Sequence, residues 1–223
     1  MFPHVRQERL HVRDAADTMN TVSINLYPFG ELAPAVQQKV IERERFFNVD
    51  SGFWYEPIIE DWTEELKQRG FEQAKILFSG FGAQGDGACF EAHINVAGYL
   101  KAYRLRKAYP LLAQYPDSVD VSLEHRGRYS HERSTHLVPY FNAEAVDPNG
   151  TGMSDTEVRA LQEYEALEKE LYQEAVRLGW QIYTALEDEY YYQISDAAVQ
   201  DMLIANEYTY LSDGTRFRLP APT

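Results

Sequence analysis

The sequence has one cysteine, no long apolar run and too few basic residues to balance its acids, and each shortage excludes a class of protein. Cys89 alone cannot form an intrachain disulfide or a cysteine-based zinc site. No run of about 18 apolar residues is present, as a membrane-spanning helix would need. The first residues also lack an apolar signal segment. We therefore expect a soluble cytoplasmic protein that does not bind membranes.

The charge balance also limits the choice of partner. The 223 residues include 21 basic and 35 acidic side chains, which gives a net charge of −14. Such a chain is repelled by nucleic acid, so no direct nucleic-acid binding is expected. The balance favours a basic protein partner or a small-molecule ligand, although a solvated acidic surface needs neither. The 16 tyrosines favour a surface role for some aromatic side chains.

Local patterns predict the secondary structure of the first part of the chain. Residues 1–20 are expected to be loosely ordered, and residues 21–27 alternate with period two, as a strand does. Helical spacing and stop signals predict helices over 34–47, 57–69 and 98–115, the last interrupted near Pro110. Further strands are predicted over 75–81, 88–96, 119–126 and 131–140. Their connections are typical of antiparallel hairpins.

The later part of the chain is predicted to be mainly helical. Ser154 and Glu157 match the capping-box pattern, which predicts a long helix from 155 to about 190. Ser195 is expected to cap a helix over 196–205, and a small hairpin should follow. The fold class expected is α+β, with an antiparallel sheet of about four or five strands. Residues 21–223 are expected to form a single domain, with the loop 142–153 as a possible sub-boundary.

The segment 78–91 is rich in glycine between two predicted strands. Glycine lets the backbone approach a partner closely, so this density indicates a tight turn, a ligand cradle or both. A helix does not follow directly, which excludes a P-loop and a dinucleotide fingerprint. The structural interpretation is that Asp86 and Gly87 simply form a hairpin turn. The functional interpretation is a polar ligand site made by Ser79, Gln84, Gly85, Asp86 and Gly87.

Histidines gather around the same strands. If the two hairpins are neighbours in one sheet, a single face would carry Glu91, His93, His125, Tyr129 and His131. Such a face could bind a polar ligand, or it could be an ordinary solvated surface. Its candidate acids and bases are His125, His131, Asp86 and Glu91. The spacing is not that of a metal site, and neither a metal nor another cofactor is expected.

The predicted helix 155–190 is strongly acidic. Between residues 154 and 192 the chain has ten acids and three basic residues. A helix of this kind can imitate the phosphate rows of DNA, although a solvated face is the commoner explanation. The aromatic run 190–192 beside these acids would suit a protein interface.

The motif Phe78-Ser-Gly-Phe-x-x-Gln-Gly-Asp-Gly-Ala-Cys-Phe-Glu91 resembles one found in a family of small phage and prophage proteins. The pattern His125-x-Gly-x-Tyr-x-His131 is similar to a second motif of that family, and the segment around Ser195 resembles its C-terminal end. The resemblance covers much of the chain from about residue 40 onward. The sequence departs from the family pattern at Gly82 and Ala83, where bulkier residues are expected. The resemblance implies a phage or mobile-element context, hence the cytoplasm of a host cell, and no particular reaction.

Four functions compete on this basis. An accessory, anti-defence protein could bind and block a host protein, or it could sequester a small nucleotide signal in the glycine-rich segment. The alternatives are a hydrolase that degrades such a nucleotide and an acidic DNA mimic. We favour a binding protein over an enzyme. The sequence leaves open the choice of partner and the presence of a homo-oligomer.

Overall fold

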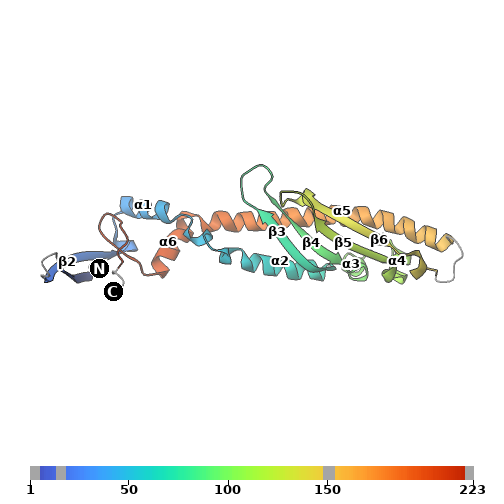
Figure 1. Cartoon of the computed structure of the whole chain (residues 1–223), viewed down its shortest axis with the longest axis horizontal. Coiled ribbons are helices and arrows are strands. Elements are labelled where there is room, and N and C mark those ends of the chain that lie inside the picture. The colour runs from blue at the N-terminus through green and yellow to red at the C-terminus, as the bar shows by residue number, and fades with distance from the viewer. Residues whose placement is uncertain (1–5, 14–18, 148–153, 219–223) are drawn as a thin grey trace. The chain divides into compact units, whose positions relative to one another are not determined.

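The residues that the structure describes form two antiparallel sheets, and the chain divides into two compact units, each described separately below. Residues 6–13, 19–147 and 154–218 are described by the computed structural model shown in Figure 1. Unit 1 comprises residues 1–54 and 189–223, and unit 2 comprises residues 55–188. The α+β fold class is confirmed. The division falls elsewhere than in the loop 142–153, of which residues 148–153 lie outside the described part.

The sheet of unit 2 has four strands in the order β3-β4-β5-β6, each antiparallel to the next. The strands are β3 (Phe71–Ser79), β4 (Gly87–Ile94), β5 (Val119–His125) and β6 (Thr135–Phe141). All four were expected, although β3 begins earlier and β6 later than the sequence pattern indicated. The two hairpins are neighbours through β4 and β5, so β3 and β6 are the edge strands.

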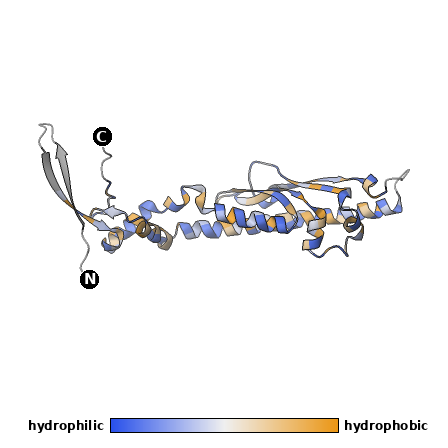
Figure 2. Cartoon of the chain, turned by 90° about the horizontal axis from the view of Figure 1, so that it is seen from below, coloured by the Kyte–Doolittle hydropathy of each residue, from blue (hydrophilic) through white to orange (hydrophobic). Residues whose placement is uncertain are grey.

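Helices cover one face of this sheet: α5 runs behind the strands in Figure 1, and the turned view of Figure 2 shows helices on one side of the sheet. The helices are α2 (Glu56–Gln68), α3 (Val96–Ala102), α4 (Pro110–Gln114) and α5 (Asp155–Gln193), whose last residues belong to unit 1. Short 3-10 helices lie at Pro116–Ser118, Glu132–Ser134 and Ala143–Ala145. The predicted helix 98–115 is thus two short helices separated before Pro110.

The core of unit 2 lies between the sheet and α5. The buried residues of α5 recur every three or four positions, which turns one stripe of the helix toward the strands. They include Ala160, Tyr164, Leu167, Leu171, Ala175, Leu178, Ile182 and Leu186. Phe90 of β4 and Leu123 of β5 meet this stripe and are almost fully buried. Each such side chain stabilises the fold by about 1.5–3 kcal/mol.

The start of α5 is fixed by the expected capping box. The Ser154 amide donates to the Glu157 carboxylate at 2.5 Å, and the Glu157 amide donates to the Ser154 hydroxyl at 3.3 Å. Two amides that the first turn of a helix leaves without partners are thereby satisfied. Glu157 is buried as a result and is not part of an acidic surface.

Unit 1 contains a smaller sheet in the order β1-β2-β7. Its strands are β1 (Arg6–Arg13), β2 (Met19–Pro28) and β7 (Thr209–Tyr210). Its helices are α1 (Pro34–Glu44), α6 (Asp196–Ala205) and the 3-10 helices Phe29–Glu31, Phe47–Val49 and Gly52–Trp54. Ser195 caps α6 as expected, through a 3.3 Å bond from the Ala198 amide.

Two expectations for unit 1 differ from the structure. Residues 6–13 and 19–20, expected to be loosely ordered, belong to strands β1 and β2, because β1 pairs with β2 along its whole length. The terminal hairpin is reduced to one bridge between Tyr210 and Arg216, because β7 pairs with β2 instead. The core of this unit consists of Phe29, Leu32, Val40, Ile41, Val199, Leu203 and Tyr210.

Candidate functional site

The glycine-rich segment packs against the β5–β6 loop, and its glycines are needed for that contact. A Cβ atom added to Gly87 would lie 2.4 Å from the Cβ atom of His131. Gly85 has a φ of +94°, and a Cβ atom there would lie 3.2 Å from the Tyr129 ring. Two of the motif's glycines therefore provide room for Tyr129 and His131 of the second motif. We call residues 80–86 the glycine loop.

Polar residues of the first motif hold the glycine loop in shape. The Asp86 carboxylate accepts a hydrogen bond from the Ala83 amide at 2.7 Å, and the Asp86 amide donates to the Ala83 carbonyl at 3.2 Å. The Ser79 hydroxyl lies 3.4 Å from the carbonyl oxygens of Gly85 and Ser130, so it links the two loops. The amides of Ala83 and Asp86 are thus used within the loop. Gln84 is exposed at its tip.

The histidines of the second motif also make structural hydrogen bonds. The His131 Nδ1 atom accepts from the Arg133 amide at 3.1 Å and caps the 3-10 helix Glu132–Ser134. The His125 Nε2 atom lies 3.1 Å from the Tyr129 carbonyl oxygen, which also accepts a 2.5 Å bond from the Ser134 hydroxyl. These bonds fix the path of the β5–β6 loop over the glycine loop.

Glu91, His93 and His125 line a different feature, a shallow groove on the sheet face opposite the helices. This groove has a volume of about 540 Å³ and includes Lys75 and Glu124. Glu91 pairs with Lys75 at 3.2 Å, and the His93 Nδ1 atom lies 3.5 Å from Asp120. Exposed ion pairs of this kind contribute about 0–1 kcal/mol and do not fix a reactive geometry.

The structure thus separates the expected cluster into two groups. Tyr129 packs against Gly85 of the glycine loop and His131 against Gly87 of β4, whereas Glu91, His93 and His125 line the groove. The reason is that the chain leaves the sheet after β5, so residues 126–134 do not continue along the face that carries His93. Among the residues that the structure describes, no three histidine, cysteine or acidic side chains come together as metal ligands would.

The single cysteine lies in the central part of the unit 2 sheet, where it pairs with Leu77 of β3. Cys89 of β4 is completely buried. Burial raises the pKa of its thiol to about 11, and the nearby charges of Glu91 and Glu132 act in the same direction. The thiol is therefore protonated and unreactive at neutral pH.

Several acids of α5 are used inside unit 2. The Glu163 carboxylate accepts hydrogen bonds from the amides of Leu111 and Leu112 at 2.9 and 3.1 Å, at the start of α4. Together with Glu157 and Glu174, it is a carboxylate held by bonds to its own unit. The acidic character of the helix is therefore partly structural, which weakens the comparison with DNA.

Glu174 is the centre of a polar network that the sequence did not indicate. Its carboxylate bonds to Arg177 and to the Tyr103 hydroxyl and lies 3.5 Å from Arg69 of the segment after α2. Burial opposes ionisation of Glu174, but the bonds from Arg177 and Tyr103 outweigh it and lower the pKa of the carboxyl. Burial and the bond to Glu174 raise the pKa of Tyr103 to about 12. The network ties α5 to the chain segments beside it.

Unit 1 carries a concentration of exposed aromatic side chains. Five of the eleven large hydrophobic residues exposed in the described part of the chain lie in two short segments, 46–53 and 191–192. They are Phe46, Phe47, Phe53, Tyr191 and Tyr192, which we call the aromatic surface, with exposed fractions of 42–74%. The rings of Trp54 and Tyr190 lie 5.8 Å apart and join the two segments. Consecutive aromatic residues in the sequence indicate this surface. The run 190–192 was predicted to suit a protein interface, whereas the pair Phe46 and Phe47 was not.

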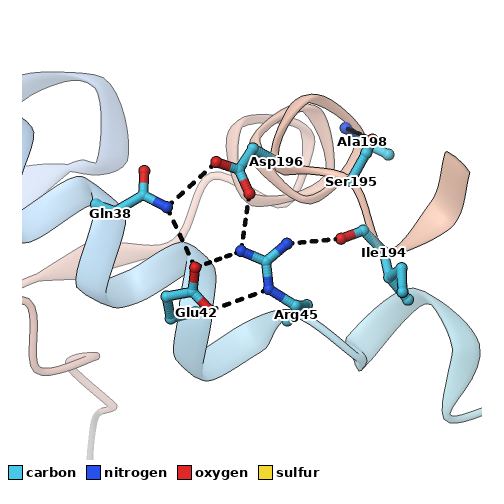
Figure 3. Close-up of polar contacts among 7 residues, drawn as sticks. All are labelled: Gln38, Glu42, Arg45, Ile194, Ser195, Asp196 and Ala198. Atoms are coloured by element: carbon cyan, nitrogen blue, oxygen red, sulfur yellow. Dashed lines mark hydrogen bonds and ion pairs between the residues drawn. The ribbon is translucent and has the colours of Figure 1, made fainter. Parts of the chain in front are cut away.

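A polar network fixes these two segments together, as Figure 3 shows. Arg45 donates to the carbonyl of Ile194 at 2.8 Å, to Glu42 and, at 2.8 Å, to Asp196. Gln38 donates to Asp196 from the other side at 3.2 Å. The hydrogen bonds from Arg45 lower the pKa of both carboxyls. These hydrogen bonds hold in place the backbone that carries the aromatic surface. They join distant parts of the sequence, since Arg45 and Ile194 are 149 residues apart.

The fold and these sites define an α+β protein in which a helix-backed antiparallel sheet is combined with a smaller unit bearing exposed aromatic residues. The chain belongs to the family described as a domain of unknown function, DUF8835, whose model matches residues 54–196. The match covers all of unit 2. No curated protein matches the chain, and no solved structure does so either. No helix within the described ranges is both long and apolar enough to cross a membrane.

Proposed function

We propose that this protein acts by binding another protein, and that the aromatic surface of unit 1 is its main contact. The observation that carries this proposal is the exposure of Phe46, Phe47, Phe53, Tyr191 and Tyr192 on two short, adjoining segments. Exposed apolar groups gathered in this way are typical of protein interaction sites. Aromatic side chains are also enriched among the residues that contribute most to binding energy.

The charges beside the aromatic surface favour a basic partner. Segments 46–54 and 189–196 contain Asp50, Glu189 and Asp196 and no lysine or arginine. Arg45, which borders them, is already paired with Glu42 and Asp196. An arginine of a partner would find aromatic rings to stack on and carboxylates to pair with. A basic partner also fits the net charge of −14.

The glycine loop and the histidines support binding over catalysis. Asp86 and His131, which the sequence offered as acid and base, each hold a loop through a hydrogen bond to a backbone amide. The amides of Ala83 and Asp86, which would have cradled a phosphate, are bonded within the loop. If the chain has the phage context that its motifs imply, the bound protein belongs to the host.

Photo-crosslinking in cells tests this proposal. A benzophenone amino acid at position 53 should crosslink to one main protein, whose contact peptide contains arginine or lysine. The same group at Trp180 is the matched control, because that side chain is 59% exposed but lies on the part of α5 that belongs to unit 2. Equal crosslinking at both positions, or none at position 53, would argue against the proposal.

Purified components then give the energetics. Phe53→Ala should weaken binding of the crosslinked protein by about 30-fold or more, as loss of a dominant contact does. Trp180→Ala should leave the affinity unchanged. Binding should also weaken as the salt concentration rises, because part of the attraction is between exposed charges.

A further inference from the structure

The free edge of the unit 2 sheet borders a groove that is separate from the sites described above. The groove has a volume of about 490 Å³ and runs between β6 and α5. One wall consists of the consecutive residues Thr135, His136 and Leu137, and the other of Glu168, Lys169, Tyr172 and Gln173. A strand edge therefore faces a helix across an open channel.

The hydrogen-bond pattern shows which backbone groups of β6 point into the channel. At the two ends of the β5–β6 ladder, Arg126 donates to the carbonyl of Ser134 at 2.9 Å, and Asn142 donates to the carbonyl of Ser118 at 2.7 Å. Residues 134 and 142 thus bond toward β5. Inward and outward bonding alternate along an antiparallel strand. The amides of Thr135 and Leu137 therefore point away from the sheet.

The position of Pro139 agrees with this outward direction of residues 135 and 137, and it limits the number of outward amides on β6. Proline has no amide hydrogen and is tolerated in a strand where that position faces away from the sheet. Pro139 has the same parity as Thr135 and Leu137, so it leaves the β5–β6 ladder intact and removes one outward donor. Before Pro139, the free edge of β6 can thus donate hydrogen bonds only from the outward amides of Thr135 and Leu137. Such a short edge does not favour continued pairing between copies of the chain.

A second observation concerns the side chain at the start of this edge. The Thr135 hydroxyl oxygen is buried without a hydrogen-bond partner, in a residue that is 1% exposed and borders the groove. Buried polar groups normally have a partner, and an unpaired one requires an explanation. In the opposite wall, Tyr172 is 40% exposed and offers a ring to an apolar side chain.

We propose that this groove binds an extended peptide, which adds to β6 as a fifth strand of the sheet. The peptide backbone would pair with the outward groups of Thr135 and Leu137, and an apolar side chain would rest on Tyr172. This is the known geometry of peptides that add to a sheet edge beside a helix. Glu168 and Lys169 have opposite charges, so recognition depends on the main chain and one apolar anchor more than on charge. The aromatic surface has no part in this inference.

The chain offers a matched pair of variants for the test. Leu137→Pro removes the outward amide hydrogen without breaking a ladder bond, as Pro139 already does two residues later. Leu137→Ala removes the same side chain but keeps the amide. Tyr172→Ala removes the anchor from an exposed helix position, where it should not affect folding.

The experiment is a selection of random dodecapeptides displayed on phage against the full-length protein, followed by fluorescence titration of the synthetic peptides. We expect binding to slow hydrogen exchange at the Leu137 amide. Leu137→Pro should weaken binding at least tenfold beyond Leu137→Ala, and N-methylation of alternate peptide amides should also weaken it tenfold. If Leu137→Pro unfolds the protein, the N-methylated peptides and the exchange at Leu137 still decide the outcome. No selected peptide, or peptides indifferent to N-methylation, would overturn the proposal, as would edge pairing between two copies of the protein.

Discussion

Replacement of Gly87 by alanine tests the contact between the two motif loops. The added Cβ atom would lie 2.4 Å from the Cβ atom and 2.7 Å from the Cα atom of His131. Both atoms are fixed to the backbone, so no side-chain rotation relieves the clash. Overpacking of this kind costs about 1–3 kcal/mol. We expect Gly87→Ala to lower the free energy of unfolding by that amount.

Gly80 is the matched control because it belongs to the same glycine-rich motif. Its added Cβ atom would lie 3.6 Å from the nearest atom, an Asp86 carboxylate oxygen, which is an ordinary contact. Gly80→Ala should therefore change stability by about 0.5 kcal/mol or less. Urea denaturation followed by tryptophan fluorescence measures both variants. Equal stability of Gly87→Ala and the parent protein would refute the argument, and so would an equal loss in Gly80→Ala.

Three further predictions concern α5 and its neighbours. Gly179→Ala should destabilise the protein, because the added Cβ atom would lie 2.8 Å from the Ala88 carbonyl oxygen. This clash should outweigh the preference of about 1 kcal/mol that alanine has over glycine in a helix. A variant that is more stable than the parent protein in urea denaturation would contradict this prediction. Glu174→Gln should cost about 1.5–3 kcal/mol at pH 7. Because the pKa of Glu174 is lowered in the folded protein, its contribution is complete above the ordinary value of 4.5 and is lost as the pH falls further. The parent protein should lose its advantage over Glu174→Gln below that pH in thermal melts, and a constant difference would exclude this role. Absorbance at about 295 nm should show Tyr103 and Tyr109 ionising near pH 12, because burial raises the pKa of both hydroxyls. Ionisation of every tyrosine near pH 10 would disprove their burial.

Local signals were enough to predict most elements of the fold. The capping box at Ser154 and Glu157 and the cap at Ser195 depend only on neighbouring residues, and both are confirmed. The four strands of unit 2 followed from period-two patterns and glycine turns. Strand β1 was missed because it is defined by its pairing with β2 and carries few apolar residues.

The candidate site was harder to predict because the roles of its residues depend on contacts between segments that are far apart in the sequence. Sequence analysis proposed Ser79, Asp86 and His131 as residues of a polar ligand site, and the structure brings the two segments that carry them together. It could not show that Asp86 bonds to Ala83 or that His131 needs the space above Gly87. Nor could it show that Arg45 reaches Ile194, because nothing in either segment encodes the other.

Cys89 gives the protein a thiol that reports on opening of the sheet. A completely buried sulfur with a pKa of about 11 cannot be alkylated in the closed structure, so its labelling rate follows how often β4 opens. The free energy of that opening is then available from the ratio of labelling rates in folded and unfolded chains, without any mutation. Fluorophores attached to cysteines introduced on the surface would also meet no competing thiol.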